Sequence, residues 1–154
     1  MATVINVNGR IAQGTDATIP VLDHGFLYGE GVYEVCRTYH GYPFLFDRHL
    51  RRLRATYRRR RDEFVDRLVA AAPRVRVEGV AAGLHALVGW PPGVTEAAVM
   101  AAAEARGIGL TPLAPGWHGE PRGEGVMVGY GRPPAHDLRR CYGAFAALMA
   151  DITR

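Results

Sequence analysis

The basic side chains of this 154-residue chain are all arginines, because the sequence holds 19 arginines and no lysine. A guanidinium is planar, always charged and able to bond two oxygens of a phosphate or carboxylate. A lysine amine can also attack a carbonyl compound and form a covalent imine. The residue types therefore permit the binding of acidic ligands and provide no lysine for imine chemistry. The net charge of +4 is a mild surplus that by itself identifies no partner.

The other reactive side chains are not spaced for catalysis or metal binding. The six histidines form no metal-binding pattern, and Cys36 and Cys141 lack a CxxC or Cys/His spacing suited to zinc. No GxSxG elbow and no GxxxxGK[ST] phosphate loop occurs. We therefore predict no catalytic residue and no metal site, and we expect both cysteines to be buried as small apolar residues.

Nine arginines lie between Arg48 and Arg67, which invites a nucleic-acid hypothesis because arginine neutralises phosphates and stacks on bases. The same stretch holds Asp62, Glu63 and Asp66, and no nucleic-acid module is recognisable. We favour a solvated helix face with local ion pairs. A nucleic-acid binder built on this helix is kept as a third hypothesis.

Strands and turns dominate the first 46 residues. The alternation around the turn Asn8-Gly9 predicts one hairpin, and residues 32–39, the turn at 40–43 and residues 44–46 predict a second. A helix is expected to begin at Asp47 as its N-cap, and a second helix to span residues 57–72 and end at Pro73.

The remaining chain predicts the order α-β-β-α-β-β-α. Strands are expected around residues 75–77, 84–88, 108–110 and 126–128. Thr95 should cap a helix through Arg106, with Ala98, Ala101, Ala102 and Ala105 as its packing face, and a last helix should bury Leu138, Tyr142, Phe145 and Met149. The pattern changes at residues 55–57 without a Ser/Gly linker, which suggests two origins in one chain.

Two sequence motifs in the first part of the chain resemble those of a known enzyme family. Residues 23–35 read DHGFLYGEGVYEV and residues 47–53 read DRHLRRL. The combination of DxGxxxGxGVYE with a downstream HLxRL resembles the N-terminal small domain of class IV aminotransferases. This family includes D-amino-acid and branched-chain aminotransferases and aminodeoxychorismate lyase. The resemblance covers about the first 55 residues.

The resemblance implies roles for three residues. The arginine that matches Arg52 grips the phosphate of pyridoxal phosphate in this family, a use that suits a guanidinium. Tyr28 and Tyr33 match aromatic positions that face the substrate pocket. The alternative is that Arg52 is a solvated helix residue and that both tyrosines belong to the core.

The second part of the chain is similar to a different group. The AAGLH strand at 81–85, the PPG turn at 91–93, the alanine-rich helix and the GY pair at 129–130 resemble the C-terminal small domain of fold-type I aminotransferases, especially that of MocR-type transcription regulators. Neither of the two resembling segments includes the large cofactor-binding domain of its family, which carries the Schiff-base lysine. The chain therefore looks like the beginning of one such protein joined to the end of another.

We thus expect an α+β fold of two small antiparallel-sheet modules with packed helices, residues 1–55 and 56–154. The function implied is that of a truncated or chimeric pyridoxal-phosphate-dependent aminotransferase, inactive alone. The alternative is a non-catalytic ligand-sensing or oligomerisation module derived from a regulator. We expect a homo-oligomer or a complementing subunit, a phosphate or amino-acid ligand, and no nucleic-acid partner. Without an apolar leader or a run of about 20 apolar residues, we also expect a cytoplasmic protein that does not enter membranes.

Overall fold

The structure is a computed structural model, and it describes residues 3–23, 31–32, 34–79, 84–116, 123–131 and 134–154. The chain divides into two compact units, Met1–Val35 and Cys36–Arg154. The described elements are helices and small antiparallel sheets, so the predicted α+β class is confirmed.

The N-terminal unit contains a hairpin of β1 (Val4–Val7) and β2 (Arg10–Gln13), as predicted. Asn8 and Gly9 form its turn with φ angles of 52° and 86°, the left-handed values that a two-residue turn of this kind needs. The Asn6 side chain accepts a hydrogen bond from the Gly9 amide at 2.8 Å. An isolated two-stranded hairpin is marginally stable, and none of the described residues of this unit is buried.

A second hairpin exists, but its second strand lies at Tyr42–Pro43, inside the predicted turn, and not at residues 44–46. It consists of β3 (Thr38–Tyr39) and β4 (Tyr42–Pro43), joined at His40 and Gly41. The strand predicted from residue 32 is wrong for residues 32 and 34–37, and Tyr33 lies outside the described residues. Alternation alone did not produce a strand there because the described segment has no partner strand.

One continuous helix, α2 (Phe46–Ala71), replaces the two predicted helices. Residues 54–57 contain neither glycine nor proline, and arginine and alanine are strong helix formers, so nothing interrupts the helix there. The predicted N-cap is also wrong: Leu45 occupies that position without a side-chain cap. Asp47 lies in the first turn instead, where its charge suits the helix dipole. The helix ends just before Pro73, as expected.

A four-stranded antiparallel sheet with the order β5-β6-β8-β7 forms the centre of the C-terminal unit. Its strands are β5 (Arg76–Glu78), β6 (His85–Gly89), β7 (Thr111–Pro112) and β8 (Gly125–Gly129). The strand predicted at residues 108–110 begins only at Thr111. A short 3-10 turn, η1 (Ala114–Gly116), follows β7.

Helix α3 (Glu96–Glu104) begins as predicted, because the Thr95 hydroxyl accepts a hydrogen bond from the Ala98 amide at 3.2 Å. Its predicted packing face is wrong. Val99 and Ala103 are the buried residues, whereas Ala98, Ala101 and Ala105 are exposed. Burial of Val99 gains more free energy than burial of an alanine, so the helix face that carries Val99 and Ala103, four residues apart, packs on the core.

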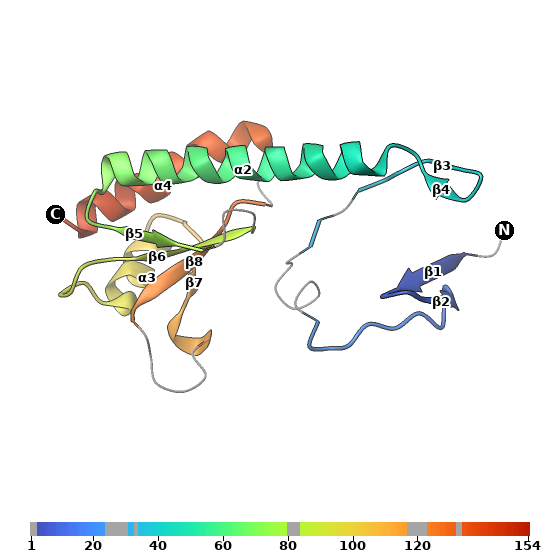
Figure 1. The fold of residues 1–154 in the computed structure, drawn as a ribbon. Coiled ribbons are helices and arrows are strands. Elements are labelled where there is room, and N and C mark those ends of the chain that lie inside the picture. Colours follow the sequence, from blue (N-terminus) through green and yellow to red (C-terminus); the bar gives the residue numbers. More distant parts are fainter. Residues whose placement is uncertain (1–2, 24–30, 33, 80–83, 117–122, 132–133) are drawn as a thin grey trace. The chain divides into compact units, whose positions relative to one another are not determined.

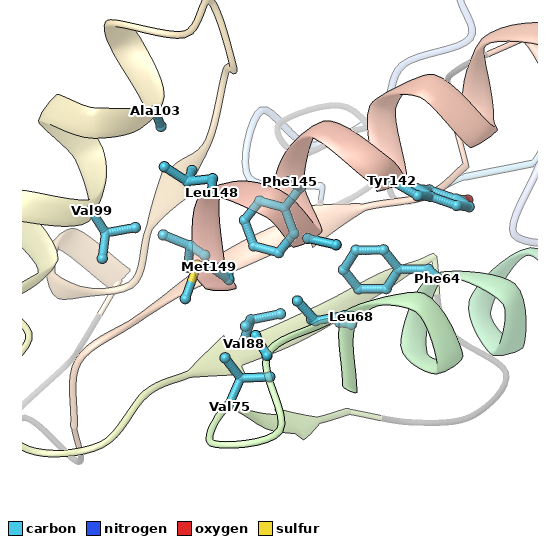
Figure 2. Close-up of a cluster of buried hydrophobic side chains, with 14 of the residues drawn as sticks. Phe64, Leu68, Val75, Val88, Val99, Ala103, Tyr142, Phe145, Leu148 and Met149 are labelled. Carbon is cyan, nitrogen blue, oxygen red and sulfur yellow. The ribbon is translucent and has the colours of Figure 1, made fainter. Parts of the chain in front are cut away.

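Helix α4 (Ala135–Ile152) buries all four of its predicted core residues. It lies along the C-terminal half of α2 in Figure 1, and α3 packs on it as well. Figure 2 shows Phe64 of α2 facing Phe145 and Tyr142, while Val99 and Ala103 of α3 face Leu148 and Met149. The α4 helix is therefore the element around which the core is assembled.

Candidate functional site

Arg52 is the one predicted site residue that the structure describes. It lies in the second turn of α2, and its side chain is exposed. Tyr28 and Tyr33 lie outside the described residues. The inherited pocket formed by these three residues therefore stays a prediction.

The N-terminal half of α2 is strongly positive. Residues 48–61, here called the cationic half-helix, hold eight arginines and no acidic residue. Arg48 and Arg52 stand four residues apart and therefore on one face, and both are exposed. Arg54 is also exposed but projects from the opposite side of the helix, since two residues correspond to about 200° of rotation. An anion that reaches Arg52 thus meets a cluster of guanidinium groups.

Acidic residues balance the charge farther along α2. Arg61 pairs with Asp62 at 3.1 Å and Arg67 with Glu63 at 3.2 Å, so the predicted local ion pairs are confirmed. The prediction of a solvated face is wrong for Arg60. Its side chain is half-buried and donates to the backbone carbonyl of Gly131 at 2.8 Å. One arginine of the run therefore holds α2 against the chain that follows β8.

Metal and thiol chemistry gain no support from the part of the chain that is described. No group of three or more histidine, cysteine or acidic side chains gathers there in a metal-binding arrangement. Both cysteines are free; Cys141 is exposed and Cys36 is only partly buried, so the expectation that both are buried is wrong. Cys141 precedes the core residue Tyr142 on α4, and this one-residue step turns it outward. Among the described residues, no helix is long and apolar enough to cross a membrane.

Sequence reasoning missed a cavity of about 300 Å³ beside α4. We call it the α4 cavity. It lies among α2, β8, α4 and the loop of residues 106–110, and its walls include Arg106, Arg140 and Cys141. These residues are far apart in the sequence and match no motif. Only the packing of the elements brings them together.

Comparison with known proteins shows a local similarity to class IV aminotransferases in the N-terminal part of the chain. The chain is 54% identical over 50 residues to aminodeoxychorismate lyase of Bacillus subtilis (strain 168), a match of 32% of this chain and 17% of that protein. It is 46% identical over 50 residues to D-alanine aminotransferase of Listeria innocua serovar 6a, with the same coverage of 32% and 17%. It is also 41% identical over 46 residues to D-alanine aminotransferase of Bacillus licheniformis, covering 30% of this chain and 16% of that protein.

The matched segment thus spans about a sixth of the length of these curated relatives. The resemblance predicted for the first part of the chain is confirmed as a similarity of about 50 residues. No protein-family profile matches the chain. The similarity of the second part to MocR-type regulators, and the boundary between modules at residue 55, stay predictions.

Class IV aminotransferases use pyridoxal phosphate, and the residues present fit one half of this cofactor. Exposed guanidinium groups at Arg48 and Arg52 suit a phosphate dianion. The other half of the cofactor, its aldehyde, needs an amine, and these 154 residues include no lysine. The donor set therefore fits ionic binding of the phosphate and does not fit lysine-linked binding.

Proposed function

We propose that this protein is a truncated or chimeric relative of class IV aminotransferases that holds pyridoxal phosphate non-covalently, with Arg52 gripping the phosphate. The observation that carries the proposal is the 54% identity over 50 residues to an aminodeoxychorismate lyase. Tyr28 and Tyr33 are the residues that would face the substrate side of this site. The single chain would bind the cofactor and would not transaminate.

The charge pattern of α2 supports a phosphate ligand. Two like charges four residues apart on a helix destabilise it by about 0.2–0.5 kcal/mol. Arg48 and Arg52 form such a pair, and both are exposed to solvent. A phosphate dianion bound between them would convert this repulsion into two charge-assisted hydrogen bonds. A bound phosphate would therefore add favourable contacts to the cationic half-helix.

Transamination needs a group that this chain does not supply. Bound pyridoxal phosphate would supply an electron sink for the substrate carbon, and an enzyme lysine amine would be needed to hold the cofactor and to move the proton. Because these 154 residues contain no lysine, that amine would have to come from outside them, as from a complementing subunit. Exposed apolar residues near the start of α2, such as Tyr42, Phe44 and Phe46, would suit such a contact or a homo-oligomer.

The test is a titration that separates phosphate binding from imine formation. Pyridoxamine phosphate carries the same phosphate but no aldehyde, so it cannot react with the amino terminus. We expect it to raise the unfolding temperature of the chain saturably, because a ligand that binds only the folded state stabilises it. Arg52→Ala should abolish the effect. Arg54→Ala is the matched control, because Arg54 is exposed on the same helix but on its opposite side.

The outcomes divide cleanly. Stabilisation lost in Arg52→Ala and kept in Arg54→Ala supports the phosphate grip. No stabilisation at millimolar pyridoxamine phosphate would leave the motif as scaffold and favour the alternative, a non-catalytic oligomerisation or ligand-sensing module. Pyridoxamine without phosphate serves as the negative control, since it offers no dianion for the guanidinium groups.

A second candidate is polyanion binding by the cationic half-helix. The observation that favours it is the run of eight arginines without an acidic residue at positions 48–61. Phosphate contacts of this kind act without sequence preference and weaken steeply with salt. Arg52→Ala and Arg54→Ala would then reduce retention on DNA equally. This equal loss distinguishes a polyanion surface from a phosphate site centred on Arg52.

A further inference from the structure

We propose that the α4 cavity binds a small organic carboxylate with a short apolar body. The cavity measures about 300 Å³ and lies wholly within the Cys36–Arg154 unit. Its described lining begins at Phe64 and so includes no residue of the cationic half-helix. The inference therefore stands or falls independently of the function proposed above.

The walls of the α4 cavity select an apolar ligand body. Ile108 and Leu110 line it from the loop after α3, Val128 from β8, and Phe145 from α4. Figure 2 shows the ring of Phe145 next to that of Phe64, which also borders the cavity, and the two ring centres are 5.9 Å apart. The volume is at the lower end of small-molecule sites. At about 30 Å³ per atom it accommodates roughly ten non-hydrogen atoms.

The charges at the α4 cavity select a carboxylate. Arg106 and Arg140 both contribute to its lining, and the described lining residues include no acidic side chain. Arg106 pairs with Asp151 at 2.8 Å and Arg140 with Asp137 at 3.0 Å. Both pairs lie at the surface, where such pairs contribute little stability. A guanidinium has five N–H donors, so each arginine can also bond a ligand carboxylate.

The same charges disfavour an ammonium group. A cation placed beside Arg106 and Arg140 would face two like charges. A free amino acid should therefore bind less tightly than the acid that lacks its amino group. A cavity that recognises its ligand by charge should bind the acid more tightly than the uncharged amide. A purely hydrophobic cavity should bind the amide more tightly.

Cys141 supplies a direct reporter of occupancy. Its thiol is free and exposed, and the residue lines the cavity. Cys36, the other free cysteine, is not among the described lining residues. In a Cys36→Ser background, the rate of alkylation by neutral iodoacetamide therefore measures access to the cavity. A ligand seated beside α4 should slow this reaction.

The experiment compares 4-methylpentanoate with its uncharged amide and with leucine, following both Cys141 alkylation and the unfolding temperature. We expect saturable protection and stabilisation by the acid, and about tenfold weaker binding of the amide and of leucine, because a charge-assisted bond is lost or a like charge is added. Equal binding of the acid and the amide, or no binding of the acid at about 10 mM, roughly the affinity of a minimal fragment, would overturn the proposal.

Two pairs of variants locate the site. Ala144→Leu adds bulk at a lining position of α4 and should abolish binding, whereas Ala147→Leu, at an exposed α4 position outside the described lining, should leave it unchanged. Arg140→Gln should weaken binding of the acid about threefold, because a contact to an exposed guanidinium is screened by solvent. Arg139→Gln should not, although the two side chains are both 78% exposed. Binding that survives both Ala144→Leu and Arg140→Gln would place the ligand elsewhere and refute the site.

Discussion

Tyr142 combines deep burial with an unsatisfied hydroxyl group. Only 3% of the residue is exposed, and its hydroxyl has no hydrogen-bond partner among the described atoms. The ring packs edge-on against Phe64 with centroids 5.3 Å apart, so the apolar part of the side chain is well packed. We expect Tyr142→Phe to raise the free energy of unfolding by about 1 kcal/mol. The substitution removes a buried hydroxyl group that loses its hydrogen bonds to water on folding and gains no partner in exchange. Urea unfolding measures this change.

The same residue predicts how stability depends on alkaline pH. Burial raises the pKa of Tyr142 from 10.0 to about 12, although the nearby Arg60 opposes the shift. The unfolded chain therefore releases this proton first between pH 10 and 12, and stability falls as the pH rises through that window. The slope contributed by Tyr142 is about 1.4 kcal/mol per pH unit. Tyr142→Phe should lose this contribution, whereas Tyr42→Phe, at an exposed position, should keep it.

Arg60 is expected to contribute to stability as no other member of the arginine run does. It donates to the carbonyls of Gly131 at 2.8 Å and Tyr130 at 3.4 Å, and it lies 5.8 Å from the ring centre of Tyr57. Loss of a hydrogen bond to a charged donor costs about 1.5–3 kcal/mol. Arg60→Ala should therefore lower the free energy of unfolding by about 2 kcal/mol. The exposed neighbour Arg59 is the control, and equal effects of the two substitutions would contradict the assignment.

At the scale of elements, Glu96 connects the start of α3 to the β7–η1–β8 segment. Its carboxylate accepts hydrogen bonds from the amides of Leu113 at 3.1 Å and Ala114 at 3.2 Å. Glu96→Ala would leave the Ala114 amide without this acceptor, whereas the Leu113 amide keeps its bond to the Gly125 carbonyl at 3.0 Å. We expect a loss of about 1 kcal/mol, measured by thermal unfolding. Glu104→Ala at the exposed end of the same helix should change stability by less than about 0.5 kcal/mol. A comparable loss in both variants would argue against this connection.

Elements with strong periodicity could be predicted from the sequence, and their boundaries depended on competing local signals. The apolar spacing of Leu138, Tyr142, Phe145 and Met149 predicted the core face of α4 correctly. The alanine face of α3 was wrong because alanines outnumber valine there, yet the burial of Val99 gains more than that of any alanine. The prediction of two helices separated near residue 55 was based on two family resemblances. The residues there have high helix propensity, so one helix continues through this position.

The two candidate sites differ in how far the sequence could reveal them. Arg52 could be predicted because a contiguous motif surrounds it, and its position on an exposed helix face follows from the helical period. The α4 cavity could not, since Arg106, Val128 and Arg140 come from three separate segments. A volume left between packed elements depends on side-chain shapes that no spacing rule encodes.

At the scale of the whole molecule, apolar side chains are distributed unevenly. Among the described residues, every buried one is at position 64 or later. Twelve of the thirteen large apolar side chains that are exposed lie instead between positions 4 and 46. Hydrophobic burial is the main favourable term in folding. The stability of the chain should therefore come almost entirely from the unit Cys36–Arg154.

Removal of residues 1–35 tests this distribution. The deletion takes away a two-stranded hairpin and no described buried side chain, so the free energy of unfolding should change by less than about 1 kcal/mol. Removal of α4 is the opposite case, because it deletes Tyr142, Phe145 and Met149, each worth about 2–5 kcal/mol, and should abolish cooperative unfolding. If the first deletion cost as much as several core residues, the N-terminal unit would have to bury surface in solution. The exposed apolar residues at 4–46 would then no longer argue for a partner chain.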